Sequence, residues 1–182
     1  IKLTSLGYYN FIPEITSALK SEIKRLCGVE IKAILNKVSA EEKQKEGIDS
    51  HAITIDGELD SEEKSIFQDG FSFNLRPLDM QKTGFYLDQR YNRLFLKNFT
   101  AQMKGLKVLD GYSYTGAFSH YIAGCASHID VVDSSNAALD AAAKNFANNG
   151  IKNFVLTEED ATRFLKSHYG YDLIVLDPPK IL

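Results

Sequence analysis

Three acidic residues, Asp110, Asp133 and Asp177, each end a short apolar run in the second half of the chain. Such runs are typical of buried parallel strands. The carboxyl ends of parallel strands meet at one edge of a sheet, and open α/β sheets bind their ligands at that edge. The pattern therefore predicts a ligand site that is lined by these carboxylates.

The loop after Asp110 suits an amino-acid ligand. Ser113-Tyr114-Thr115-Gly116 leads into an amphipathic helix that begins near Ala117. Backbone N–H groups of this loop suit a carboxylate, and Asp110 suits an ammonium group, directly or through water. A nicotinamide enzyme is expected to carry Gly-x-Gly-x-x-Gly here, and this chain does not. A plain strand–helix turn is the alternative interpretation.

Two further carboxylates are predicted to recognise a nucleoside that is attached to the amino acid. Asp133, at the end of the next strand, can accept hydrogen bonds from both ribose hydroxyls. Asp160 can accept one from the exocyclic amine of adenine. Ser134 and Ala161, which follow them, belong to the same predicted cofactor segments. Each aspartate has a structural alternative, because an aspartate before a helix caps its first turn.

The most specific short motif is Asp177-Pro178-Pro179-Lys180. Together with the other two strand-end acids, in this order, it resembles a class I S-adenosylmethionine methyltransferase. The resemblance implies that the two prolines stiffen the backbone just past the sheet, where a substrate base would meet the methyl donor. Enzymes that methylate exocyclic amines commonly place an aromatic residue after the prolines, to stack on the base. Because Lys180 stands there instead, the motif argues against methylation of an amino group.

The elements that position these residues form two predicted domains. Residues 1–80 are predicted to form a small α+β domain, and residues 81–182 a Rossmann-like sheet of the α/β class. The first contains a helix over 13–26, strands over 29–38 and 51–55, and a hairpin over 65–75 with an Asp69-Gly70 turn. The second alternates helices with strands over 106–110, 129–133, 154–156 and 172–176. Repeated β-α-β connections indicate a parallel sheet.

Composition limits the partners. The chain has 182 residues, is 44% hydrophobic and carries a net charge of −3, so it can form a packed core but has no bulk attraction for nucleic acid. An RNA partner would require a local basic patch. Such an excess is supplied by Arg90, Arg93, Lys97, Lys104 and Lys107. An ordinary solvated helix face is the alternative interpretation of these residues.

Neither the cysteines nor the histidines have the spacing of a metal site. Cys27 and Cys125 are expected to be buried thiols in a reducing cytoplasm. No signal peptide is visible, and no apolar run approaches the roughly 20 residues of a membrane span, so a cytoplasmic protein without a membrane partner is predicted. Because Ile1 is not Met and Leu182 falls just past a strand-end motif, both ends are expected to be cut.

Several motifs occur in a fixed order: Lys45-Glu46-Gly47, Gly57-Glu58-Leu59, the segment 82–90, the loop 113–116 and the segment 177–180. Together they resemble the bacterial 23S ribosomal RNA cytosine-5 methyltransferases that carry an N-terminal PUA domain. The resemblance runs from about residue 40 to the end. It implies a PUA domain, a central α+β domain and a Rossmann-like catalytic domain, of which this chain would hold the second and half of the third.

The resemblance implies S-adenosylmethionine as the cofactor and 23S ribosomal RNA as the substrate. It assigns to the cofactor cleft Ser113, Tyr114, Thr115, Gly116, Asp133, Asp160 and Asp177, flanked by Asp88, Gln89 and Arg90. The chain departs from the family pattern at two places. At Gly111-Tyr112 relatives often have a bulkier residue followed by Phe, and at Ala117 they often have Gly.

Carbon methylation implies a particular chemistry. Cytosine C5 is a weak nucleophile, so a cysteine thiolate adds to C6 and the resulting enamine attacks the methyl group of the cofactor. Loss of the C5 proton then breaks the bond between C6 and sulfur and releases the enzyme. The family's cysteine follows a later strand in a Ser-Cys-Ser context, which this chain does not contain. Asp177 fits the catalytic acid that binds the pyrimidine edge.

Two rivals stay open: a related rRNA guanine methyltransferase, and a non-catalytic fragment that binds cofactor, RNA or a partner. Only four strands are predicted after residue 105, whereas the methyltransferase fold uses seven. The chain by itself is therefore expected to be inactive. Its apolar edge over 172–176 is expected to pair with another chain, as in a homodimer.

Overall fold

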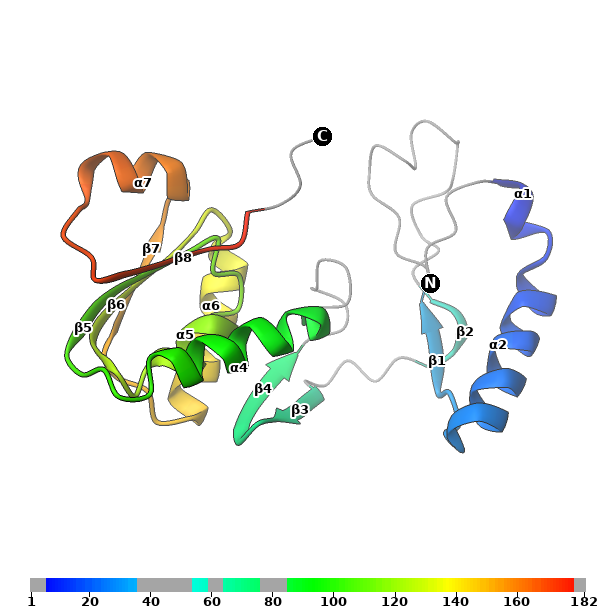
Figure 1. Ribbon diagram of the computed structural model, residues 1–182. Helices are drawn as coiled ribbons and strands as arrows, with labels where there is room; N and C mark the ends of the chain where they lie inside the picture. Colours follow the sequence, from blue (N-terminus) through cyan, green and yellow to red (C-terminus); the bar gives the residue numbers. More distant parts are fainter. Residues whose placement is uncertain (1–5, 36–53, 59–63, 76–84, 179–182) are drawn as a thin grey trace. The chain divides into compact units, whose positions relative to one another are not determined.

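The structure is a computed structural model that describes residues 6–35, 54–58, 64–75 and 85–178. Contacts divide the chain into two compact units, Ile1–Ser61 and Glu62–Leu182 (Figure 1). The predicted domain boundary at residue 80 falls outside the described residues and stays a prediction. The contacts group the hairpin that precedes it with the second unit.

The first unit pairs two helices with a short antiparallel ribbon. Its elements are α1 (Leu6–Tyr9), α2 (Ile12–Cys27), β1 (Ala33–Leu35) and β2 (Thr54–Gly57). Pro13 stands in the first turn of α2, and Gly28, with φ of 67°, ends it. The predicted helix is confirmed, and the first predicted strand is shorter than expected at its start. Cys27 is exposed at the end of α2, so the expectation of two buried thiols is wrong for this residue.

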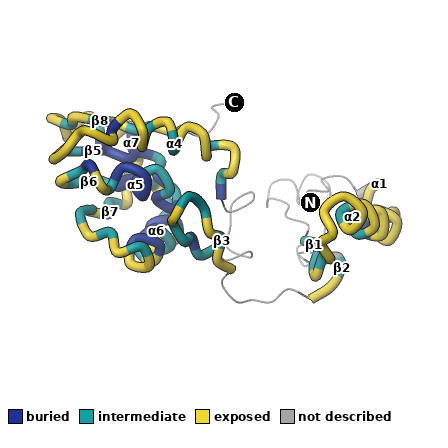
Figure 2. The backbone as a smooth tube through the Cα atoms, turned by 60° about the horizontal axis from the view of Figure 1, so that its bottom comes forward, coloured by how far each residue is buried: buried dark blue, intermediate teal, exposed yellow. Residues whose placement is uncertain are grey.

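The second unit is built on a parallel sheet, which confirms the predicted α/β class. Its strands are β5 (Leu106–Gly111), β6 (Ala126–Asp133), β7 (Phe154–Glu158) and β8 (Leu173–Leu176), in the order β7-β6-β5-β8. The helices are α4 (Arg90–Phe99), preceded by the 3-10 turn η1 (Leu87–Gln89), then α5 (Ala117–Ile122), α6 (Asn136–Asn148) and α7 (Ala161–Ser167). Burial is concentrated in β5, β6, α5 and α6 (Figure 2).

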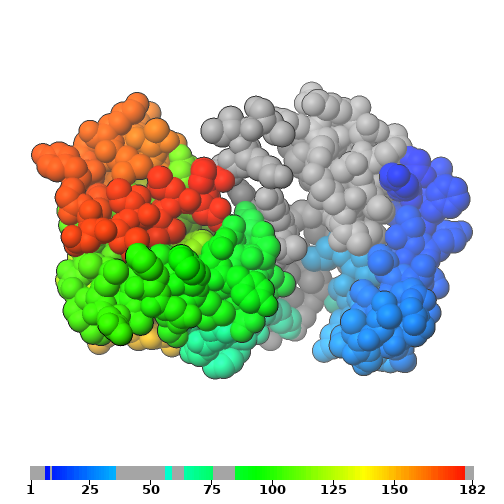
Figure 3. Space-filling model, in the orientation of Figure 1, coloured from blue at the N-terminus to red at the C-terminus, as the bar shows by residue number. Residues whose placement is uncertain are grey.

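The hairpin β3 (Lys64–Gln68) and β4 (Phe71–Leu75) has the predicted two-residue turn. Asp69 and Gly70 both have positive φ, 53° and 92°, as a type I′ turn requires. The side-chain amides of Asn145 in α6 and of Asn149, which directly follows this helix, bond the free edge of β4. The Asn145 Oδ1 accepts from the backbone N–H of Asn74 at 2.8 Å, and the Asn149 Oδ1 accepts from that of Ser72 at 2.9 Å. These bonds attach the hairpin to the sheet-bearing unit, where Figure 3 shows it in teal beside α4 in green.

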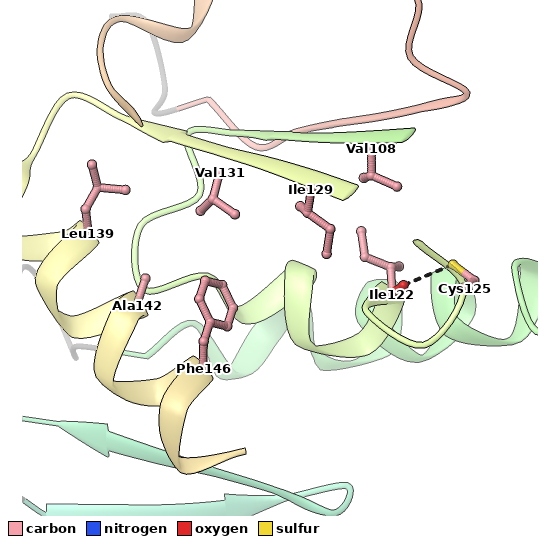
Figure 4. Close-up of a cluster of buried hydrophobic side chains, with 8 residues drawn as sticks. All are labelled: Val108, Ile122, Cys125, Ile129, Val131, Leu139, Ala142 and Phe146. Atoms are coloured by element: carbon pink, nitrogen blue, oxygen red, sulfur yellow. Dashed lines mark hydrogen bonds between the residues drawn. The ribbon is translucent and has the colours of Figure 1, made fainter. Parts of the chain in front are cut away.

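The two faces of the sheet bury alternate residues of the central strands β5 and β6. Val108, Ile129 and Val131 pack against α5 and α6, around the fully buried Phe146 (Figure 4). Their neighbours Leu109 and Val132 belong to a second cluster, with Ala161 and Phe164 of α7 on the opposite face. Because successive strand residues point to opposite faces, β5 and β6 each contribute to both clusters.

Candidate cofactor site

The predicted strand-end acids lie at one edge of the sheet. Gly111, the last residue of β5, pairs with Val132 of β6 and with Leu176 of β8. Asp133 is therefore the last residue of β6, and Asp177 follows β8 directly. The chain leaves β5 toward β6 on one side, and β8 lies on the other, so this edge is the topological switch point at which open α/β sheets bind ligands.

The loop between β5 and α5 is held in a strained conformation. Tyr112 and Tyr114 have φ of 58° and 52°, in the left-handed region that non-glycine residues rarely adopt. The loop is fixed by the backbone bond of Ser113 N to Val132 O, 3.1 Å long, and of Gly116 N to Ser113 O, 2.9 Å long. Strain of this kind persists only where the surroundings enforce it, and it is concentrated at functional sites.

Asp133 anchors this loop from the neighbouring strand. One carboxylate oxygen accepts from the backbone N–H of Tyr114 at 2.8 Å, and the other from that of Ser135 at 2.9 Å. Each oxygen keeps a second acceptor position, which fits the two hydroxyls of a ribose. Ser135, rather than the exposed Ser134, caps α6, since its side chain accepts from Ala138 N.

Asp110 is buried, and its described contacts lie within the protein. Its Oδ2 accepts from the backbone N–H of Ser119 at 3.1 Å and from the Ser119 hydroxyl at 2.6 Å. Burial raises the pKa of Asp110 to about 6, against the opposing effect of these bonds, and the charges of Asp177 and Asp133 raise it further. Asp110 thus ties the first turn of α5 to the end of β5, a role that the sequence did not reveal. Its contact with an ammonium group stays a prediction.

Replacing Asp110 by asparagine is expected to change how stability depends on pH. Because the folded pKa of about 6 lies above the ordinary value of 3.8, Asp110 favours folding most below pH 3.8 and loses that contribution as the pH rises to 6. The loss is about 3 kcal/mol, because a difference of one in the pKa corresponds to about 1.36 kcal/mol of stability. Asp110→Asn should lack this loss of stability. Urea unfolding should therefore show that the free energy of unfolding of the variant rises relative to that of the wild type between pH 4 and pH 7. Parallel stability curves would contradict the assignment.

A tyrosine that sequence reasoning missed lies at the same edge. The ring of Tyr86 meets that of Tyr114 edge-on, with centroids 5.6 Å apart and planes at 75°. Burial raises the pKa of Tyr86, and the charges of Asp177, Asp88 and Asp133 raise it further. Its hydroxyl therefore lies in the electrostatic field of these three carboxylates. The signal that could have identified it is its place directly before Leu87-Asp88-Gln89-Arg90.

Two residues of that segment use their side chains elsewhere. The guanidinium of Arg90 bonds the carboxylate of Asp69, with Nε 3.0 Å from Oδ2. The Gln89 Oε1 accepts from the Asn92 side chain at 2.7 Å. In the described contacts both side chains serve local structure, and their contact with a cofactor stays a prediction.

The interpretation of α4 as a solvated basic face is wrong for Arg93. This side chain is 1% exposed and lies over the ring of Phe85, 4.8 Å from its centroid. Its Nη2 donates to Gln68 Oε1 at 2.9 Å. The exposed side of the helix instead carries the aromatic residues Tyr91, Phe95 and Phe99.

Asp160 caps a helix, which is the structural alternative to adenine recognition. It precedes α7, and its Oδ1 accepts from the backbone N–H of Arg163 at 2.8 Å, as an N-cap does. Ala161 is buried against Leu109 and Val132. The neighbouring Thr162 hydroxyl lies 2.7 Å from the Tyr112 hydroxyl, which ties the strained loop to α7. Recognition of adenine by Asp160 stays a prediction.

The donor and acceptor set fits an amino-acid nucleoside. Ser113 is buried, and its hydroxyl has no hydrogen-bond partner among the described residues, as expected for a group that a ligand satisfies. Thr115 and Gly116 are buried beside it. Within the described ranges, no group of three or more His, Cys, Asp or Glu side chains could hold a metal ion. None of the helices in that part of the chain has the length and apolar character needed to cross a membrane.

Known proteins resemble this chain in sequence. A relative from Shewanella amazonensis, named ribosomal RNA large subunit methyltransferase I, is 36% identical over 155 residues, which make up 81% of this chain and 38% of the relative. A Deinococcus radiodurans protein, named ribosomal RNA large subunit methyltransferase, is 37% identical over 70% of this chain and 32% of its own length. The chain thus spans less than two fifths of these relatives.

Solved structures show the same fold. A SAM-dependent methyltransferase from Agrobacterium tumefaciens superposes with a TM-score of 0.61 and 28% identity, over 67% of this chain and 41% of that protein. Another structure, described as a methyltransferase complexed with SAH, gives 0.71 and 27% over 93% of this chain and 43% of that one. The family model for S-adenosylmethionine-dependent methyltransferases matches residues 7–182. The chain therefore belongs to the S-adenosylmethionine-dependent methyltransferase family.

Proposed function

We propose that this chain is the cofactor-binding part of a cytoplasmic enzyme that methylates C5 of a cytosine in 23S ribosomal RNA. The observation that carries the proposal is the carboxylate-lined edge at the β5–β8 switch point, in a chain whose relatives are named as large-subunit rRNA methyltransferases. Because the chain spans only 38% of the first relative, the activity belongs to the whole protein.

The cofactor's parts have matching groups on the protein. Asp133 accepts from the ribose hydroxyls. The backbone N–H groups of Ser113, Tyr114 and Gly116 already donate within the protein, so the N–H of Thr115 and the hydroxyl of Ser113 receive the carboxylate of the methionine part. The carboxylates of Asp88, Asp133 and Asp177 make the edge electronegative, which favours a ligand that carries a sulfonium and an ammonium. When bound, S-adenosylmethionine supplies an electrophilic methyl group.

Asp177 is the proposed contact to the target base. It follows β8 at the switch point, and its charge raises the pKa of both Asp110 and Tyr86, which supports a place near these two residues. A carboxylate there can hold the pyrimidine edge and orient C5. The residues after Pro178, including Lys180, lie outside the described residues, so the preference for carbon over an amine rests on the motif itself.

Deletion of the full-length gene is expected to remove one 5-methylcytidine from 23S rRNA. Mass spectrometry of rRNA nucleosides from the deletion strain would measure this loss, and a plasmid copy of the gene should restore the nucleoside. A copy carrying Asp177→Ala should fail to restore it, because the variant cannot hold the pyrimidine edge. Loss of a methylguanosine instead would favour the rival guanine methyltransferase, and an unchanged nucleoside profile would favour a non-catalytic protein.

A further inference from the structure

The turn of the β3–β4 hairpin carries a carboxylate with partners on two helices. Asp69 accepts from the Arg90 guanidinium at the start of α4, where Nε lies 3.2 Å from Oδ1 and 3.0 Å from Oδ2. It also accepts from the Tyr121 hydroxyl of α5 at 2.7 Å. The side chain of Asp69 is only 12% exposed. One carboxylate therefore links three elements that are far apart in the sequence.

The residue before the turn bonds to the same two helices. The Gln68 Oε1 accepts from Arg93 Nη2 of α4 at 2.9 Å and lies 3.2 Å from the Tyr121 hydroxyl of α5. Arg93 and Tyr121 are both buried, and the guanidinium lies 5.7 Å from the tyrosine ring centroid. The tip of the hairpin is thus inserted into a polar network between α4 and α5.

This network ends beside the proposed cofactor cleft. Arg90 comes two residues after Asp88 and four after Tyr86, whose ring packs on Tyr114. Phe85, at the start of this segment, is buried and lies 4.7 Å from Phe73 of β4, centroid to centroid. The segment 85–90 is therefore held between the hairpin on one side and the loop 113–116 on the other.

We infer that Asp69 is a positioning residue for the cofactor cleft, because its bonds to Arg90 and Tyr121 fix where the segment 86–88 lies against the loop 113–116. The inference rests on the proposed cofactor site. The position demands this residue type. Asp and Asn tolerate the left-handed φ of 53° at the turn, but only an ionised carboxylate accepts paired, charge-assisted bonds from a guanidinium. The hydrogen bond from Arg90 also lowers the pKa of Asp69, so the carboxylate stays ionised near neutral pH.

The first test follows the segment itself. The chain contains no tryptophan, so Tyr86→Trp introduces a single fluorescent reporter at the cleft. Adding Asp69→Asn, which suits the turn but cannot form the charged pair, is expected to raise acrylamide quenching of that tryptophan about twofold. Arg90→Lys should act in the same direction, since it keeps the charge but loses the planar fork. Unchanged quenching in both folded variants would overturn the inference.

The second test measures binding in the chain with Tyr86 intact, by calorimetry with S-adenosylhomocysteine well below the melting temperature. Tyr121→Phe and Asp69→Asn are expected to weaken binding about tenfold. Tyr171→Phe is the matched control, since it removes a tyrosine–aspartate bond of the same 2.7 Å length, to Asp130. It should leave the affinity unchanged. A purely structural role would lower the melting temperature of both tyrosine variants and leave both affinities unchanged.

The two tests separate this inference from the proposed function. If the wild-type chain binds no S-adenosylhomocysteine, the proposed cofactor site is wrong, and the tryptophan measurement alone decides whether Asp69 positions the segment. If the wild type binds but the Asp69 and Tyr121 variants bind equally well, the site stands and the positioning role falls.

Discussion

Gly116→Ala is expected to destabilise the second unit by about 2–5 kcal/mol and to abolish cofactor binding. A Cβ atom at this position would lie 2.5 Å from Cζ of Phe146, a separation that real Cβ atoms do not show. Phe146 cannot move aside easily, because it is fully buried between two other rings. Its ring centroid lies 4.6 Å from that of His120 and 4.4 Å from that of Phe154. Overpacking of about 1–3 kcal/mol adds to about 1–2 kcal/mol for a left-handed alanine.

A matched variant separates these two contributions. Gly150 has nearly the same φ, 68° against 72°, but a Cβ there would meet nothing within 4 Å. Gly150→Ala should therefore show only the backbone cost in calorimetric unfolding. Phe146→Leu should rescue part of the Gly116→Ala defect when the two are combined, a coupling that a double-mutant cycle measures. Equal destabilisation by the two glycine variants would contradict the packing argument.

Asp133→Ala is expected to weaken S-adenosylhomocysteine binding by roughly ten- to hundredfold. Charge-assisted hydrogen bonds contribute about 1.5–3 kcal/mol, and the substitution also removes the acceptor for Tyr114 N, which fixes the loop. Calorimetry on the folded variant measures the change. Unchanged affinity would exclude Asp133 from the cofactor site.

The control for Asp133 lies at the other end of the same sheet. The Asp172 Oδ2 accepts from the backbone N–H of Lys107 at 2.8 Å, the same kind of bond and length, at the amino ends of β5 and β8. Asp172→Ala should leave cofactor affinity unchanged. An analogue of the cofactor that lacks the ribose hydroxyls should bind the wild type more weakly but lose little further in Asp133→Ala. That result would assign the effect to the hydroxyls rather than to the loop.

Much of the sheet and its edge could be predicted from local sequence. The apolar runs that end at Asp110, Asp133 and Asp177 are short and clearly bounded, and β-α-β order leaves few arrangements for them. The Asp69-Gly70 turn was predicted for the same kind of reason, because its backbone conformation favours a few residue types. Local chemistry determined these features, so local reasoning found them.

The missed features depend on contacts between distant residues. Tyr91, Phe95 and Phe99 are apolar and recur at helical spacing, but they face outward, and Arg93 faces inward because Gln68 and the ring of Phe85 receive it. Those partners lie on other elements, which a pattern within one helix does not identify. The bond from Ser119 to Asp110 was missed for the same reason, since either residue alone has an ordinary position.

The contact of Asn145 and Asn149 with β4 has a consequence for how the hairpin tolerates a change of length. Asn145 and Asn149 are one helical turn apart, a rise of about 6 Å, and their partners Asn74 and Ser72 are two strand residues apart, about 6.6 Å. The two spacings nearly match, so both amides can bond the strand at the same time. Removing the residue between Ser72 and Asn74 would leave only one of the two hydrogen bonds in place. It would also turn the following side chains of β4 to the opposite face of the hairpin. The length of this stretch should therefore be far less variable than that of an ordinary surface hairpin.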